Sequence, residues 1–303
     1  MTNRQKGIAC AVTGGVFWGG SGVAGQYLLQ DASFATEWIV TVRLVCGGLI
    51  LLAMDAMSHH GDIFRVWKLR QNVVELLFFG VFGLMAVSYT YFASIRYGNA
   101  AAATVLQYLM PAFMVIYTVL RYRKAPSGVQ VGCVVLAMLG TFFLVTHGDM
   151  GTMSIPLPAL LWGIGAAVTG AMYTIAPKPT IREWRASPIV GWRMFVGGIA
   201  TVLVLQPPLV SGTWTMTSAF ALAYLVLFGT VAAFGLYLSS TRYIQPSEAG
   251  VLASVEPLTA IILSVVLFGT HFVVMDFLGS ACILATVAIL ARVKGGGDHE
   301  KNH

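Results

Sequence analysis

The second half of this chain repeats landmarks of the first half at a nearly constant distance. The dipeptide Arg-Tyr at 96–97 precedes Pro111, and the same dipeptide at 242–243 precedes Pro257, with equal offsets (242 − 96 = 146 and 257 − 111 = 146). The other matches are Ala-Val-Thr-Gly at 11–14 and at 167–170, and Arg43 with Arg193, which precede Gly-Gly at 47–48 and 197–198. A repeat of this length predicts two homologous halves.

Composition indicates that both halves lie in a membrane. Of the 303 residues, 57% are hydrophobic and 10% are charged, whereas a soluble domain carries about 25% charged residues. Apolar runs of about 20 residues, long enough to cross a bilayer, recur along the whole chain. Because the backbone must satisfy its hydrogen bonds internally at that depth, these runs are predicted to be helices. Ten spans are predicted, at 7–29, 34–57, 73–95, 99–120, 128–146, 157–177, 187–206, 218–240, 246–268 and 274–292.

The predicted spans divide into two sets of five. We expect a first five-helix repeat at 1–147, a periplasmic linker at 148–156, a second repeat at 157–293 and a polar cytoplasmic tail at 294–303. Because five is an odd number of crossings, the second repeat would sit upside down relative to the first. The predicted fold is an all-α integral membrane protein with ten transmembrane helices as two inverted five-helix repeats, an architecture typical of secondary transporters.

The net charge of +6 is explained by membrane orientation rather than by a nucleic-acid partner. With the N-terminus inside, the basic residues of the cytoplasmic side are Arg4, Lys6, Arg65, Lys68, Arg70, Arg121, Arg123, Lys124, Lys178, Arg182, Arg185, Arg242, Arg292, Lys294 and Lys301. The outer loops hold Asp31, Asp149 and Asp276, with Arg96 as their only basic residue. This is the positive-inside distribution. We therefore expect a multi-pass protein of a bacterial inner membrane with both termini in the cytoplasm.

Residue patterns for enzymatic chemistry are missing from the predicted spans. All six histidines fall in loops or in the tail, and the predicted spans contain no H-E-x-x-H, G-x-S-x-G or Walker pattern. The four cysteines lie within spans without paired spacing, so neither a disulfide nor a metal site is predicted. We expect no catalytic residues, no metal and no cofactor. Gly15 and Gly19, four residues apart, favour close helix packing.

Two prolines and one acid mark the expected centre of the protein. Pro111 and Pro257 fall in the middle of the fourth and ninth spans, where a proline leaves a carbonyl without a donor. Paired interrupted helices indicate the central site of a transporter, and a simple kink is the alternative. Glu256 lies mid-span, where an ionised group costs at least ~2.5–3.5 kcal/mol unless it is paired or hydrated. Its role is open between proton exchange, contact with a substrate ammonium, and a hydrogen bond to the broken backbone beside it.

Two arginines and a set of aromatic residues complete the candidate site. Arg43 and Arg193 are candidates for a substrate carboxylate or for salt bridges within each repeat. Arg193 lies only about seven residues inside its span, so its side chain could reach the cytoplasmic surface. The other candidate binding residues are Trp18, Tyr89, Gln107, Tyr108, Trp162, Tyr173 and Ser254. Aromatic rings bind apolar ligands and can face a cation, although ordinary packing is the alternative for some of them.

The segment Phe17-Trp18-Gly19-Gly20-Ser21 and the segment Leu-Ala-Ser-Val-Glu-Pro-Leu-Thr-Ala at 252–260 resemble the drug/metabolite transporter superfamily, specifically its ten-helix EamA-type members. The similarity covers essentially the whole chain. Within the family, the length and the aromatic-rich spans are most similar to the aromatic amino acid exporters of bacterial inner membranes (YddG-type). The resemblance implies a cavity between spans one to four and six to nine, with spans five and ten as outer supports. The Gly-Glu that many members carry after spans four and nine is absent here, so its role is not carried over.

We therefore expect an inner-membrane secondary transporter that exports hydrophobic or aromatic amino acids and related small metabolites by alternating access, with no enzymatic activity. Protons are a candidate coupling ion. Five helices per half can close a cavity within one chain, which makes a monomer sufficient. The nearest alternative is a broad-specificity multidrug or cationic-metabolite exporter. A more distant one is a non-transporting membrane scaffold, which would produce no solute flux.

Overall fold

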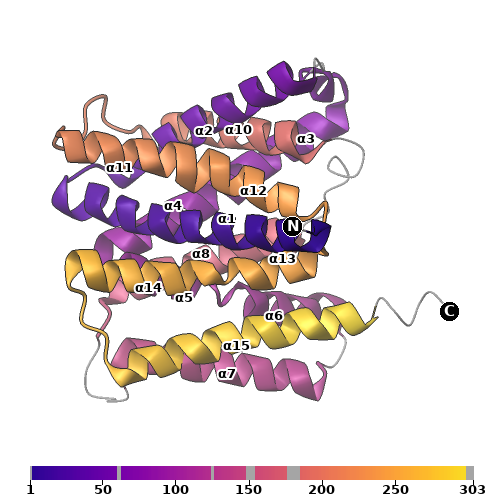
Figure 1. Cartoon of the computed structure of the whole chain (residues 1–303), viewed down its shortest axis with the longest axis vertical. Coiled ribbons are helices and arrows are strands. Elements are labelled where there is room, and N and C mark those ends of the chain that lie inside the picture. The colour runs from indigo at the N-terminus through magenta and orange to yellow at the C-terminus, as the bar shows by residue number, and fades with distance from the viewer. Residues whose placement is uncertain (1, 60–62, 124–125, 148–153, 176–184, 298–303) are drawn as a thin grey trace.

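Helices account for all the regular structure in residues 2–59, 63–123, 126–147, 154–175 and 185–297, the parts of the chain that the computed structural model describes (Figure 1). The elements are α1 (Asn3–Gln26), η1 (Tyr27–Asp31), α2 (Thr36–His59), η2 (Arg65–Lys68), α3 (Arg70–Phe78), η3 (Phe79–Met85), α4 (Ala86–Tyr97), α5 (Ala100–Gln107), α6 (Met110–Tyr122), α7 (Gly128–Thr146), α8 (Leu157–Ile175), α10 (Ala186–Leu205), α11 (Met216–Val226), η4 (Leu227–Ala232), α12 (Ala233–Ser240), α13 (Pro246–Ala253), α14 (Val255–Phe268) and α15 (Val274–Gly297). The predicted linker and tail lie partly outside the described residues, and Lys124, Asp149, Lys178, Arg182 and Lys301 lie wholly outside them.

The predicted spans agree with the helices. Within the described residues, nine helices of 19 to 29 residues are long and apolar enough to cross a membrane, and each coincides with one of the first nine predicted spans. The tenth predicted span coincides with a shorter apolar helix, Val274–Leu290. The ends agree to within a few residues, as for the third span, which is predicted at 73–95 and observed at Arg70–Tyr97. The all-helical membrane class of the fold is therefore confirmed.

Three of the spans contain a π-helical segment that the sequence did not predict. η1 ends the first span, whereas η3 and η4 lie inside the third and eighth spans. π-helical turns are rare and occur often at functional sites. η3 and η4 both contain a Phe-Gly pair, at 79–80 and 228–229. Gly80 allows a neighbouring helix to come close, because a Cβ added at Gly197 of α10 would lie 2.7 Å from the Gly80 carbonyl oxygen.

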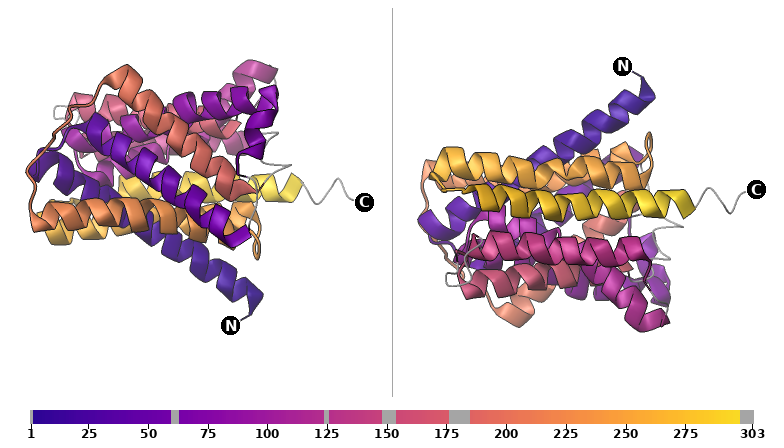
Figure 2. Two further views of the ribbon diagram at one scale, coloured as in Figure 1. Left: turned by 90° about the horizontal axis from the view of Figure 1, so that it is seen from above. Right: turned by 90° about the horizontal axis from the view of Figure 1, so that it is seen from below.

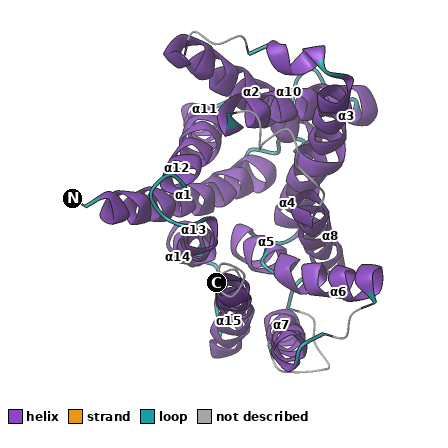
Figure 3. Ribbon diagram, turned by 90° about the vertical axis from the view of Figure 1, so that its right-hand side faces the viewer, coloured by secondary structure: helices purple, strands orange, loops and turns teal. Residues whose placement is uncertain are grey.

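Helices from the first and second halves of the chain pack against one another. α2 lies along α10, α4 lies along α8, and α1 lies along α12 and α14. α7 packs on α15, and this pair stands at one edge of the molecule (Figures 1 and 3). That edge position is the outer place that the family resemblance implies for the fifth and tenth spans. The remaining spans therefore form the body in which a central site would lie.

The two ends of the chain lie at the same end of the bundle, where α1 begins and α15 ends (Figure 1). The first turns of α1 project from the neighbouring helices (Figure 2). Arg4 in these turns pairs with Glu248 of α13, with 2.9 Å between Nη2 and Oε1. His147, directly after α7, pairs with Asp276 of α15 at 2.9 Å between Nε2 and Oδ1. The side that faces the cytoplasm stays a prediction from the positive-inside rule.

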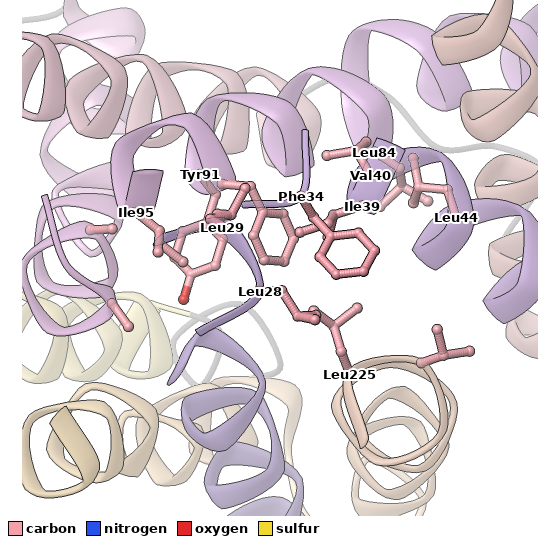
Figure 4. Close-up of a cluster of buried hydrophobic side chains, with 14 of the residues drawn as sticks. Leu28, Leu29, Phe34, Ile39, Val40, Leu44, Leu84, Tyr91, Ile95 and Leu225 are labelled. Atoms are coloured by element: carbon pink, nitrogen blue, oxygen red, sulfur yellow. The ribbon is translucent and has the colours of Figure 1, made fainter. Parts of the chain in front are cut away.

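A cluster of fully buried side chains packs around the connection between η1 and α2 (Figure 4). Leu28 of η1, Ile39 of α2 and Leu225 of α11 are each 0% exposed, and Phe34 from the connection between η1 and α2 is also 0% exposed. Since Leu225 belongs to the second half of the chain, this cluster joins the two halves. Within a bilayer, the van der Waals packing of such side chains holds the helices together.

Glycines bring α1 into backbone contact with α14, as the spacing of Gly15 and Gly19 predicts. A Cβ added at Gly15 would lie 2.7 Å from Val255 Cγ1, and one added at Gly19 would lie 2.5 Å from the Glu256 carbonyl oxygen. Real Cβ atoms do not approach other atoms so closely, so glycine is required at both positions. The first span is thereby held against the segment that carries Glu256.

The prediction that Arg193 could reach the cytoplasmic surface is wrong. Arg193 of α10 is 0% exposed, and its Nη2 donates to Oε1 of Glu75 in α3. Its guanidinium also lies over the ring of Phe79, 4.4 Å from the ring centroid. The reason is the position of α3, which packs along α10 and brings a carboxylate to the buried face. The observed salt bridge joins the second half of the chain to the first, so the predicted salt bridge within the second repeat is wrong.

The ion pair between Arg193 and Glu75 makes a testable contribution to stability. Glu75→Leu leaves a fully buried guanidinium without its carboxylate, and we expect the free energy of unfolding to fall by about 3–5 kcal/mol. The double variant Glu75→Leu/Arg193→Met removes both charges and should recover most of this loss, because an apolar pair of similar volume packs without a charge. Thermal unfolding of the purified protein in detergent measures both effects. A single variant that melts like the wild type would contradict this account.

Candidate functional site

The fourth and ninth spans are both interrupted, three residues before the prolines. α5 ends at Gln107 and α6 begins at Met110, while α13 ends at Ala253 and α14 begins at Val255. The residues at the breaks, Tyr108 and Ser254, are equivalent in the repeat (254 − 108 = 146) and have ψ angles of 0° and 2°. The interruption that Pro111 and Pro257 predict is therefore present in both spans, and each proline lies in the first turn of the new helix.

Tyr108 connects the two breaks. Because Pro257 has no N–H, the carbonyl of Ala253 four residues earlier has no helical donor. The hydroxyl oxygen of Tyr108 lies 3.2 Å from this Ala253 oxygen and 3.3 Å from Oε2 of Glu256, so its one proton is shared between the two acceptors. A side chain from the break of the first half thus contacts both the broken backbone and the acid of the second half. Glu256 itself is partly exposed, not buried in the packed core.

Arg43 lies near this pair on α2. Its Nε donates to Oγ1 of Thr230 in η4 at 3.0 Å, and its guanidinium lies over the ring of Phe92, 5.2 Å from the centroid. Glu256 is within electrostatic range of Arg43, but no ion pair joins them among the described contacts. The Arg43 side chain is partly exposed. The site therefore contains a cation and an anion that attract each other without direct contact.

Buried hydrogen bonds join the helices next to the site. The hydroxyls of Tyr91 and Thr104 lie 2.8 Å apart, and Thr104 Oγ1 donates to the Ala100 carbonyl at 2.7 Å. Tyr91 approaches α1 at Gly22, where an added Cβ would lie 2.5 Å from the Tyr91 hydroxyl. Tyr91 is also within electrostatic range of Arg43 and Glu256. These contacts fix α4 and α5 relative to α1.

Trp18 of α1 packs against aromatic residues of the second half. Its ring packs on Phe234 at 5.2 Å and on Tyr237 at 5.3 Å, both in α12. Tyr237 is in turn within electrostatic range of Tyr108. Since Gly19, next to Trp18, lies against the backbone carbonyl of Glu256, the helix that carries Trp18 packs on the start of α14. Trp18, Tyr108, Ser254, Glu256 and the two broken helices therefore belong to one region.

The remaining candidates lie in two other groups. Tyr89 and Trp162 pack edge to face, with centroids 5.6 Å apart, and join α4 to α8. Tyr173 of α8 packs edge-on against Phe79, with ring centroids 5.6 Å apart. Because Arg193 lies over the same Phe79 ring, Tyr173 is a neighbour of the Arg193–Glu75 pair. Gln107, at the end of α5, is partly exposed beside the first break. The structure thus brings part of the predicted set together and assigns Tyr173 to a different neighbourhood.

Sequence reasoning overlooked several residues that shape this region. Thr230 accepts a hydrogen bond from Arg43, and Thr104 pairs with Tyr91. Glu75, the partner of Arg193, lies close to the start of its span and was not singled out. Polar side chains inside apolar helices were the available signal for Thr230 and Thr104, but their partners come from distant segments. Among the described residues, no three His, Cys, Asp or Glu side chains converge on a point that could hold a metal ion.

Apolar spans, two interrupted helices and a charged centre between them define an integral membrane protein of the secondary transporter class. The sequence profile of the EamA-like transporter family matches residues 5–146 and again residues 157–292, so the chain belongs to this family. Its relatives include the uncharacterized inner membrane transporter YicL of Salmonella typhimurium, which is 36% identical over 96% of this chain and 97% of its own length. The uncharacterized inner membrane transporter YhbE of Escherichia coli is 24% identical over 85% of this chain and 80% of its own length. A crystal structure with 17% identity superposes with a TM-score of 0.63 over 95% of this chain and 96% of the other, which shows a shared fold.

These comparisons and the apolar helices establish a multi-pass transporter of the inner membrane. The family is one of transporters and not of enzymes. A membrane transporter acts on a small-molecule substrate within a lipid bilayer, so both are implied partners. The names of the relatives give no substrate.

Tyr108→Phe tests the connection between the two breaks. Loss of the hydroxyl removes the donor to the Ala253 carbonyl and to Glu256, and we expect the free energy of unfolding to fall by about 1–2 kcal/mol. Tyr117→Phe is the matched control, because Tyr117 lies on α6 and is 42% exposed. The control should change stability by less than about 0.5 kcal/mol. Chemical unfolding in detergent measures both variants, and equal effects would show that the Tyr108 hydroxyl does not support the break.

Proposed function

We propose that this protein exports hydrophobic, mainly aromatic, amino acids and related small metabolites across the inner membrane by alternating access. The observation that carries the proposal is the contact between Tyr108 and Glu256, which joins the interrupted helices of the two halves. In secondary transporters such paired breaks supply the substrate site at the middle of the bilayer. The same site would therefore be reached from one side of the membrane and then from the other.

Alternating access requires two halves that rock against each other, and the packing supports such halves. The pairs α1–α12 and α4–α8 occupy corresponding places if the first span is equivalent to the sixth and the third to the eighth. The π-helical segments η3 and η4 also fall in corresponding spans, and the family profile matches once in each half. We infer two inverted repeats, 1–147 and 157–293, with 148–156 as the periplasmic linker and 294–303 as the cytoplasmic tail. Both termini would then be cytoplasmic, and a monomer suffices.

The character of the site supports an apolar zwitterion as substrate. Trp18, Tyr108 and Tyr237 supply rings near Glu256, and rings bind apolar and aromatic side chains. Every lysine lies outside the predicted spans, whereas a site for phosphorylated substrates needs several buried cations. Glu256 would bind the substrate ammonium or exchange a proton during the cycle. Tyr89, Trp162, Gln107 and Ser254 would line the path on either side of the breaks, and Tyr173 would lie near its margin.

A second candidate function is export of cationic metabolites or drugs. It is favoured by one observation, the partly exposed Glu256 carboxylate beside Tyr108, because a carboxylate and an aromatic ring together can bind an organic cation that carries no carboxylate. A membrane scaffold without transport activity is a weaker alternative, since it gives no reason for paired broken helices.

Flux of radiolabelled phenylalanine into proteoliposomes tests the proposed function. We expect saturable uptake by the wild type, measured first without an ion gradient and then with an imposed pH gradient. Glu256→Gln should abolish uptake or its dependence on pH, because the variant has no ionisable group at the break. Uptake without any gradient would make the protein a facilitator and Glu256 a binding residue, whereas uptake only with the gradient would make Glu256 the proton carrier.

Glu248→Gln is the matched control for this experiment. Glu248 lies on the same span, at the end of the bundle where it pairs with Arg4, so its loss should leave flux nearly unchanged. Absence of phenylalanine uptake in both conditions would contradict the proposal. Uptake of organic cations in its place would then establish the second candidate function.

A further inference from the structure

Two arginines at equivalent positions have opposite surroundings. Arg43 lies on α2 and Arg193 lies on α10, and each precedes a Gly-Gly pair by four residues. Each guanidinium lies over a phenylalanine ring, Phe92 for Arg43 and Phe79 for Arg193. Each also contacts the span that contains a π-helical segment in the other half, because Thr230 belongs to η4 and Phe79 belongs to η3. The surroundings of Arg43 can therefore be compared with those of Arg193.

Arg193 shows what a complete site of this kind contains. Its charge is balanced by the carboxylate of Glu75, and the pair is closed off from solvent, with the Arg193 side chain 0% exposed. Removing an unbalanced charge from water is costly, so a buried guanidinium requires an anion. Within this protein, the anion at the Arg193 site is supplied by the chain itself.

Arg43 has the ring but not the carboxylate. Where Arg193 meets Glu75, Arg43 meets the neutral hydroxyl of Thr230 through Nε. Among the described residues no acid forms an ion pair with Arg43, and its two Nη groups make no hydrogen bond. The side chain is partly exposed, so these groups remain accessible to a ligand. The two Nη groups of Arg43 are therefore without an anionic partner among the described residues.

Thr230 holds the guanidinium in one orientation. Its hydroxyl accepts from Arg43 Nε at 3.0 Å and donates to the Leu225 carbonyl at 2.9 Å, five residues back in the π-helical turn. Thr230 is 0% exposed, so this arrangement is fixed by packing. With Nε occupied, the Nη groups are left for a carboxylate, which an arginine can bind through two parallel hydrogen bonds.

We infer that Arg43 binds the carboxylate of the transported molecule and that Thr230 is its positioning residue. The substrate is then required to carry a free carboxylate, and Glu256 across the site meets its ammonium group. Arg43 and Glu256 carry opposite charges and do not contact each other. They therefore correspond to the carboxylate and the ammonium group of one amino acid. This inference rests on the proposed function, which supplies the amino acid as substrate. It adds the residue that recognises the carboxylate of that substrate.

Ligand-dependent melting of the purified protein tests the inference with two matched pairs, phenylalanine against phenylalaninamide and leucine against leucinamide. Each amide keeps the ammonium group and the side chain but has no carboxylate. We expect the amino acids to raise the melting temperature and to bind about tenfold or more tightly than their amides, as loss of a charge-assisted bidentate contact implies. Arg43→Gln should remove the difference between acid and amide, and Arg43→Lys should restore part of it.

Thr230→Val provides a second variant that keeps Arg43 in place. It should reduce the preference for the carboxylate without removing it, which a loss of stability alone would not do. Thr201→Val is its control, because Thr201 of α10 is also 0% exposed and donates to a backbone carbonyl, that of Gly197, at 2.8 Å. The control should lower the ligand-free melting temperature while leaving the preference unchanged.

Equal stabilisation of the wild type by an amino acid and its amide would overturn the inference, and so would stabilisation by none of the four compounds. A carboxylate preference in the leucine pair alone would support the role of Arg43 and overturn the aromatic specificity of the proposed function. Carboxylate-dependent binding without flux in proteoliposomes would likewise support Arg43 and overturn export.

Discussion

The structure depends on how a chain surrounded by lipid satisfies its backbone hydrogen bonds. Helices solve this problem along most of the chain, and the two breaks are the exceptions. At the second break, Pro257 removes a donor, and the Ala253 carbonyl accepts from Tyr108 of the other half. The broken backbone is thus stabilised only when the two halves meet. This makes the centre of the protein both its least regular part and the place where the halves are joined.

Charge follows the same logic. An arginine at depth requires an anion, and the protein meets this requirement in two ways. Arg193 has Glu75 and is sealed within packed helices, which makes the pair part of the framework. Arg43 has a hydroxyl in place of the acid and remains partly exposed. In the mechanism that we propose, Arg43 exchanges ligands while Arg193 stays part of the framework.

Glycine residues allow pairs of helices to come into backbone contact. Gly15 and Gly19 allow α1 to touch α14, and Gly80 and Gly197 allow η3 to touch α10. Close backbone contact gives large areas of van der Waals attraction without interlocking side chains. Such surfaces can slide, which suits a protein whose halves must change their relative position. The π-helical segment η3 lies at the second of these contacts, and a π-helical turn is wider than an α-helical one.

The sequence by itself determined the helical class, the positions of the ten spans, the family and the two interruptions, because hydrophobic length, the repeat and the prolines are local signals. It also predicted Glu256 as a site residue through its mid-span position beside Pro257, and Trp18 through its match with Trp162 in the other half. Only the tertiary structure decided the partner of each arginine, since Glu75 and Thr230 lie more than one span away in sequence. The π-helical turns were likewise invisible, because packing against another helix stabilises them. A repeated residue is therefore predictable from the sequence, whereas its partner is set by how the two halves meet.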